Sequence, residues 1–168
     1  MRHLLCFVFV IGTCSSAFTL AQELEDYVPL KQRRVLEHWL VQNPTLRVAT
    51  DADCQCPENI NEIRKGSGGV WKGNPTYHPY SASGDFNDDG EIDFSVVVID
   101  NAKKQYVVIF NGPLLPGNKP AYQSSSHVGA LFYGPPRPKP YRLIVGNFNS
   151  EGGLFVPKGK SYVYDGGN

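Results

Sequence analysis

The sequence lacks a surplus of charge and a long hydrophobic segment. Its 16 basic residues are balanced by 16 acidic residues, so no overall basic field is present to attract nucleic acid or an anionic membrane surface. The longest apolar run, residues 4–12, is too short to span a bilayer. At 168 residues the chain is long enough for one hydrophobic core and short for two. We therefore expect a single domain.

Histidines and catalytic motifs are also scarce. His38, His78 and His127 do not form an H-E-x-x-H zinc helix, and the sequence has no G-x-S-x-G nucleophile elbow. Ser126 beside His127 fits a polar turn better than a triad, because adjacency along the chain does not create catalytic geometry. Residues 159–161 imitate the end of a P-loop, but no phosphate-binding helix fits behind them. A small secreted hydrolase with its site between the aromatic loop and His127 stays open as an alternative, and no catalytic residue is assigned.

The N-terminus has the pattern of a secretory signal peptide. Arg2 and His3 precede the apolar run, and small residues lead to a cleavage site after Ala21. A membrane anchor and a lipoprotein site at Cys14 are the alternatives; the first has too few apolar residues and the second has Thr13 where Gly or Ala is usual. We expect residues 1–21 to be the signal peptide, residues 22–168 to be the domain, and the protein to be secreted or periplasmic.

Only two of the four cysteines follow that segment. Cys54 and Cys56 are then each other's only partner within the chain, so an oxidising compartment allows a small ring between them. The C-x-C spacing is not the C-x-x-C of thioredoxin-like redox proteins, which makes a redox role the lesser reading. Removing residues 1–21 also takes away one basic residue and no acidic one, so the mature chain has a net charge of −1.

The most specific pattern is an acidic segment, residues 84–94, with the sequence GDFNDDGEIDF. Oxygen-bearing side chains fall at loop positions 1, 3, 5 and 9, namely Asp85, Asn87, Asp89 and Asp93, and Glu91 can offer its backbone carbonyl at position 7. Gly at position 6 allows the sharp turn that such loops need. Because Ca²⁺ takes six to eight oxygen ligands, this spacing predicts a calcium site at residues 85–93.

The segment resembles the GDFNGDGxxD calcium loops of FG-GAP/VCBS-type repeats, which are found in integrin-like propeller blades and are followed by a strand. The resemblance covers about a dozen residues and implies the same five ligands. An EF-hand is excluded because Val96 occupies the position of its bidentate Glu. A whole propeller does not fit, since it needs at least four blades of about 40 residues each.

An ordinary acidic turn is the simpler reading of the same residues, because Asn, Asp and Gly favour turns. Charge argues against it, since five acidic residues crowd the segment and no Lys or Arg occurs between Lys72 and Lys103. A partial second copy at residues 146–152 has Gly153 and Phe155 where further ligands should stand, so we read it as a turn or a lapsed copy.

Two helices are predicted in the first half of the chain. Pro29 can open a helix that carries an apolar stripe to Leu40 and ends at residues 43–44, and Pro57 opens a shorter one that stops at Gly66. A short extended piece is expected at residues 45–50. Residues 66–83 are rich in Gly, Pro and aromatic residues, which predicts a loop. Its aromatic side chains either bind a ligand or cover the hydrophobic core, and we favour the second interpretation.

The second half of the chain predicts strands. Residues 94–99 and 106–110 are β-branched and aromatic runs joined by a polar turn, which indicates a central hairpin. Residues 128–133 and 141–145 predict two more strands, and residues 161–164 an edge strand, with a loop at 113–126. This order predicts an α+β fold with the N-terminal helices packed on a mainly antiparallel sheet of about four to five strands.

The functional hypothesis is an exported, calcium-stabilised domain that binds a protein or a carbohydrate and is not an enzyme. An exported inhibitor or immunity-type binder is a further alternative. The sequence does not distinguish a carbohydrate-binding module from an inhibitor or immunity-type binder.

Overall fold

The computed structural model describes residues 27–67, 73–135, 137–148 and 152–166. The expected signal peptide, Trp71 of the aromatic loop and residues 149–151 of the partial second copy lie outside these ranges. In the described part, no helix is both long and apolar enough to cross a bilayer.

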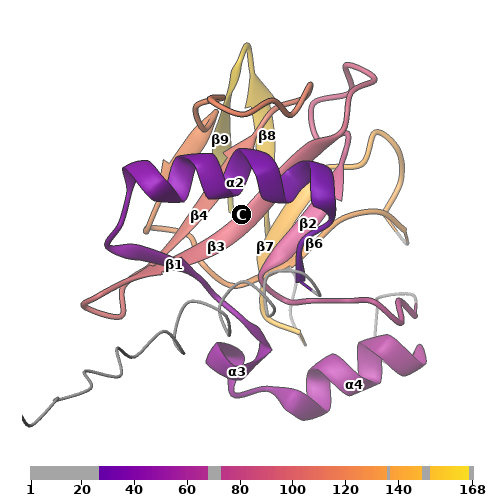
Figure 1. Ribbon diagram of the computed structural model, residues 1–168. Coiled ribbons are helices and arrows are strands. Elements are labelled where there is room, and N and C mark those ends of the chain that lie inside the picture. The colour runs from indigo at the N-terminus through magenta and orange to yellow at the C-terminus, as the bar shows by residue number, and fades with distance from the viewer. Residues whose placement is uncertain (1–26, 68–72, 136, 149–151, 167–168) are drawn as a thin grey trace, which may run out of the picture.

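The described chain forms three helices and two antiparallel sheets, which confirms the α+β class (Figure 1). The helices are α2 (Leu30–Gln42), α3 (Asp51–Cys54) and α4 (Pro57–Lys65). The first sheet contains β1 (Leu46–Val48), β2 (Ser81–Gly84), β3 (Asp93–Asp100), β4 (Gln105–Phe110) and β5 (Tyr122–Ser124). The second contains β6 (Ala130–Phe132), β7 (Leu143–Gly146), β8 (Gly153–Lys158) and β9 (Ser161–Asp165).

The predicted α+β fold with mainly antiparallel strands is confirmed, and the nine described strands divide into two sheets, of five and four strands, where the sequence indicated one. Sheet one has the order β1-β3-β4-β5, and β2 also pairs with β3; sheet two has the order β6-β7-β8-β9. The predicted central hairpin is confirmed as β3 and β4, which pair with Phe94 opposite Phe110. β3 is buried along almost its whole length, as its apolar residues on both faces require.

The helix α2 lies across the first sheet (Figure 1). Its buried residues Val35, Leu36 and Trp39 recur at helical spacing, and the Trp39 ring meets Phe110 of β4 edge-on, with ring centroids 5.9 Å apart. The other face of β3 and β4 packs on the second sheet, because side chains of both sheets belong to one buried cluster.

The second sheet is covered on its other face by α4. Along β6 and β7, alternate side chains point to opposite faces: Leu131 belongs to the main core, whereas Phe132 and Ile144 join Ile60 and Ile63 of α4 in a second cluster. Gly66 ends α4 in the left-handed conformation, with φ of +81°, as expected for a C-cap glycine.

Candidate functional site

The acidic loop connects β2 to β3. These two strands pair antiparallel with Gly84 opposite Asp93, so residues 85–92 form the turn of a hairpin. The sequence predicted a strand directly after the loop, and β3 begins at Asp93 as expected. It did not predict β2, whose residues are small and polar.

The side chains of Asp85, Asn87 and Asp89 are tied together inside the loop. The two carboxylate oxygens of Asp85 accept hydrogen bonds from the backbone N–H groups of Asp89, at 3.0 Å, and Gly90, at 2.9 Å. Asn87 Oδ1 also accepts from the Asp89 N–H, and Asn87 Nδ2 donates to Asp89 Oδ2. Asp89 Oδ1 accepts from the Glu91 N–H at 2.9 Å. The loop is thus folded around its own oxygen-bearing side chains.

Two residues of the loop adopt left-handed backbone conformations that allow this folding. Gly90 has φ of +88° and Asp88 has φ of +65°. Glycine takes this conformation without strain, and Asp is among the few other residues that tolerate it. The sharp turn predicted at Gly90 is therefore present.

Asp93 points inward and is fully buried. Its Oδ2 accepts from the Phe86 N–H at 2.8 Å and from the Tyr162 hydroxyl at 3.2 Å, and its Oδ1 accepts from the Gly112 N–H at 2.9 Å. Burial raises the pKa of Asp93, which outweighs these three hydrogen bonds. A carboxylate has about four lone-pair positions, so these three hydrogen bonds leave one position unused.

The loop is also fixed to the second sheet. The Tyr133 hydroxyl, just after β6, donates to the carbonyl oxygen of Asp85 at 3.0 Å, and Arg142, just before β7, donates to the carbonyl of Phe86 at 3.1 Å. Phe86 is buried and meets the Tyr133 ring edge-on. The Tyr133 ring occupies the place of a Cβ at Gly84, so only glycine fits there.

These positions can be tested for their fit to Ca²⁺. The donor set consists of oxygens, as hard cations require, and the carboxylates of Asp85 and Asp89, which accept two hydrogen bonds each, keep further lone pairs. Burial raises the pKa of Tyr162, and the charges of Asp93, Asp89 and Asp85 raise it further; of these, Asp93 accepts the hydrogen bond from the Tyr162 hydroxyl. Within the described ranges, no salt bridge joins these acids to a basic residue, and no three His, Cys, Asp or Glu side chains already stand as a metal cluster. The donor types suit a hard cation, while the described acidic side chains do not form a preassembled metal cluster.

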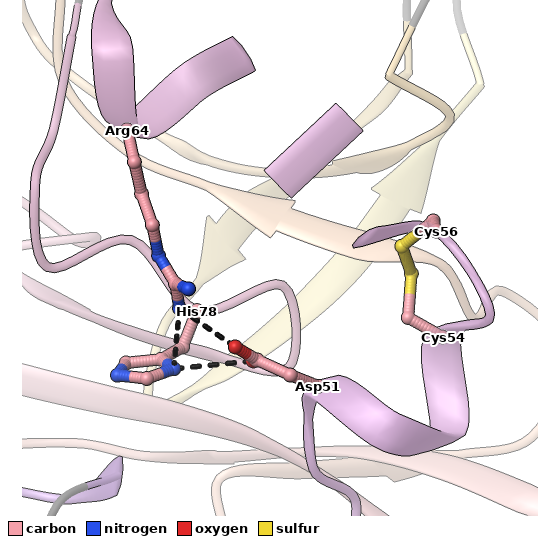
Figure 2. The surroundings of a disulfide bond; sticks show 5 residues. All are labelled: Asp51, Cys54, Cys56, Arg64 and His78. Atoms are coloured by element: carbon pink, nitrogen blue, oxygen red, sulfur yellow. Dashed lines mark hydrogen bonds and ion pairs between the residues drawn. A yellow bond between two sulfur atoms is a disulfide. The ribbon is translucent and has the colours of Figure 1, made fainter. Parts of the chain in front are cut away.

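A second polar cluster lies where α3, α4 and the segment before β2 meet. Figure 2 shows Asp51, Arg64 and His78 pointing toward one another, beside the disulfide that joins Cys54 to Cys56. Arg64 Nη2 lies 2.6 Å from Asp51 Oδ2, and His78 Nδ1 lies 3.1 Å from Asp51 Oδ1. Arg64 Nη2 also lies 3.2 Å from His78 Nδ1, so this nitrogen faces both a carboxylate that accepts and a guanidinium that donates, and Nε2 is the remaining ring nitrogen.

The cluster is charge-balanced and partly buried. Burial favours a higher pKa for Asp51, but hydrogen bonds from His78 and Arg64 together lower it, so the carboxylate stays ionised. The hydroxyls of Tyr27 and Tyr77 are buried close by, and neither makes a hydrogen bond to any described residue. Burial first, and then the Asp51 charge, raises the pKa of both phenols.

A cavity of about 410 Å³ opens beside this cluster. Its walls come from β2, the end of β6 and the turn before β2. The lining includes residues 81–83, 131–133 and 76–78, with Tyr27, Pro29, Ile63, Asn74 and Pro135. Sequence reasoning missed this site, because its walls come from segments far apart in the chain. The one signal was the aromatic composition of residues 66–83.

The described aromatic residues of that segment divide between two roles. Tyr80 belongs to the main core, as expected for a side chain that covers the hydrophobic core. Tyr77 is also buried, but together with His78 it lines the cavity.

The remaining catalytic candidates are not brought together in the described structure. His127 stacks on the Tyr164 ring, with centroids 3.6 Å apart, and Ser126 donates its N–H to Ser124 Oγ in a turn. His38 is on the exposed side of α2 beside Gln42. Residues 159–160 form the hairpin turn between β8 and β9, where a phosphate-binding helix has no place.

No family model matches this chain, and no curated protein or solved structure matches it either.

Proposed function

We propose that this protein is an exported calcium-binding domain that works as a non-enzymatic module for a protein or carbohydrate ligand, with Ca²⁺ stabilising its fold. The observation that carries the proposal is the folding of residues 85–91 around the Asp85 carboxylate, which gathers the side chains of Asn87 and Asp89. The ligands in this proposal are Asp85, Asn87, Asp89 and Asp93, with the Glu91 backbone carbonyl.

Electrostatics supports a cation at this loop. Five acidic residues lie within nine positions, and like charges at this spacing repel one another. A divalent cation removes that repulsion and supplies the partner that the described basic residues do not provide. Extracellular calcium sites bind with dissociation constants of about 10⁻⁴ to 10⁻³ M. At about 1 mM Ca²⁺, this adds roughly 0.4 to 1.4 kcal/mol to stability.

The test is calorimetric titration of the purified chain with CaCl₂, with Mg²⁺ as the competing cation. We expect one site, and we expect Asp85→Asn and Asp89→Asn to weaken calcium binding at least tenfold. Asp88→Asn is the matched control, because it removes the same charge from the neighbouring position without removing a ligand, and Asn tolerates the left-handed backbone there. Equal weakening by all three variants would mean that the loop attracts cations only through its net charge, and absence of heat would disprove the site.

Export is tested separately. Expression with the native N-terminus should release a mature chain that begins at Gln22, as mass spectrometry of the exported fraction can show. A chain that keeps residues 1–21, or that is lipid-modified at Cys14, would contradict this part of the proposal.

A further inference from the structure

We propose that the cavity between β2 and β6 binds a small uncharged carbohydrate, one of whose hydroxyls forms a hydrogen bond with Nε2 of His78. This inference names a ligand class for the binding module proposed above, but it rests on the cavity and not on the calcium loop. The volume of about 410 Å³ lies within the 300–1,000 Å³ range typical of small-molecule sites.

The described lining of the cavity is polar but uncharged. Asn74, Thr76, Ser81 and Ser83 offer amide and hydroxyl groups, and no Asp, Glu, Lys or Arg is among the described lining residues. A charged ligand would lose its hydration there without gaining an opposite charge, which is unfavourable. The lining therefore favours a neutral ligand with several hydrogen-bonding groups.

Aromatic rings form the apolar part of the wall. Tyr77 and Phe132 stack on each other, with centroids 5.5 Å apart and an interplanar angle of 14°, and both are buried, whereas Tyr133 at the same end of β6 is partly exposed. Such rings provide rigid, amphipathic contact surfaces. A sugar ring has the complementary chemistry, because its C–H face packs on aromatic rings while its hydroxyls both donate and accept hydrogen bonds.

The orientation of the His78 ring is set by its contacts with Asp51, Arg64 and Tyr27. Asp51 Oδ1 and Arg64 Nη2 lie 3.1 Å and 3.2 Å from Nδ1, and the His78 ring packs against Tyr27 with centroids 4.2 Å apart. Figure 2 shows the other ring nitrogen turned away from Asp51 and Arg64, and Nε2 makes no hydrogen bond to any described residue. Nε2 can form a hydrogen bond with a ligand hydroxyl in either tautomer, because a hydroxyl both donates and accepts, and the His78 side chain is 23% exposed. Asp51 is thus a positioning residue.

The charges of the polar cluster are paired with each other. The Arg64 guanidinium already bonds to Asp51 and to the carbonyl of Tyr77, at 2.6 Å and 2.9 Å. Its charge is cancelled by Asp51 across the shortest of these contacts. Arg64 and Asp51 therefore neutralise each other, which disfavours binding of a ligand carboxylate or phosphate.

The experiment is a titration followed by NMR on the isotope-labelled full chain, with the His78 ring and the amides of residues 74–83 as reporters. The probes are glucose, galactose, mannose and N-acetylglucosamine, with glucuronic acid as the charged control and N-acetyl-trialanine amide as the peptide control. We expect saturable shifts with at least one neutral sugar. We expect His78→Gln to weaken its binding at least tenfold, and Asp51→Asn to weaken it while changing the tautomer signature of the His78 ring.

His38→Gln is the matched control, because it changes an exposed histidine on α2 and should leave binding unchanged. Thr76→Phe tests the cavity from an exposed position, where the change does not disturb the core, and should also abolish binding. Each titration is run in EGTA and in CaCl₂, so that failure of the calcium site and failure of the cavity are distinguishable. The proposal is overturned if no neutral sugar shifts these signals, if glucuronic acid or the peptide binds more tightly, or if His78→Gln and Thr76→Phe bind as the parent does.

Discussion

Asp93 links three separate parts of the molecule through one carboxylate. A buried charge is unfavourable unless hydrogen bonds compensate for it. Here the donors are the loop at Phe86, the segment after β4 at Gly112, and β9 at Tyr162. The side chain is thus part of the fold, in addition to its proposed place among the calcium ligands.

We expect Asp93→Asn to lower the free energy of unfolding by about 2 to 4 kcal/mol, because an amide has one acceptor oxygen and its NH₂ group meets N–H donors. Urea unfolding in EGTA measures this without any contribution from calcium. Asp88→Asn serves as the control, since Asp88 is exposed, and should change stability by less than about 0.5 kcal/mol. A small effect at Asp93 would mean that its three hydrogen bonds do not stabilise the fold.

A pH-dependent prediction concerns Asp53 at the start of α3. Arg47 donates to both of its carboxylate oxygens, at 2.7 Å and 2.8 Å, and Thr50 donates its backbone N–H. The Arg47 hydrogen bonds are the main cause that lowers the pKa of Asp53 from 3.8 to about 2. Because this pKa is lowered in the folded state, its contribution is present above pH 3.8 and is lost as the pH falls toward 2.

At neutral pH, Asp53→Asn should therefore cost about 1 to 2 kcal/mol, a range that allows for solvent screening of the partly exposed pair. The difference from the parent should shrink as the unfolding free energy is measured at pH 4, 3 and 2. Glu58→Gln, which removes an exposed carboxylate on α4, should show a much smaller difference. A constant difference across this pH range would contradict the ion-pair explanation.

At the scale of elements, α2 offers a matched test of burial. Leu36 is fully buried, whereas Leu30 at the start of the same helix is 59% exposed. Leu36→Ala should lower the free energy of unfolding by about 2 to 5 kcal/mol, because it removes packed methyl groups and leaves a cavity. Leu30→Ala should change it by less than about 0.5 kcal/mol. Similar effects, measured by chemical unfolding, would mean that α2 does not pack on the sheet.

The same helix shows what the sequence predicts well. The sequence predicted a helix that begins at Pro29, carries an apolar stripe and ends at Asn43-Pro44. This is close to the observed helix, Leu30–Gln42. The β3–β4 hairpin was equally clear, because long runs of Val, Ile and Phe favour buried strands. In both elements the local pattern and the packing agree.

The missed strands have weak local patterns. β2, Ser81–Gly84, contains only small residues and forms because it pairs with β3 over four residues. β8, Gly153–Lys158, contains Pro157 and follows the partial loop copy, yet it pairs on both sides with β7 and β9. Such strands are specified by their partners, and a single sequence does not show which strands will meet.

At the scale of the whole molecule, the calcium loop could be predicted from its spacing, whereas its connections could not. Asp85, Asn87 and Asp89 lie close together in the chain, so a local motif describes them. The contacts of the loop with Tyr133, Arg142 and Tyr162 join residues up to 69 positions apart. The cavity beside His78 depends on contacts of the same long-range kind, which explains why sequence reasoning did not place it.

These connections predict how calcium acts on the whole fold. Because the loop is tied to both sheets, a cation bound at residues 85–93 should stabilise both sheets against the same unfolding event. Hydrogen exchange at about 1 mM CaCl₂ should slow by roughly two- to elevenfold relative to EGTA, and by the same factor at the central amides of β3 and β7. Asp89→Asn should remove the difference in both sheets, and Asp88→Asn should leave it in place. Slower exchange confined to the loop and β3 would show that the second sheet opens independently of the calcium site.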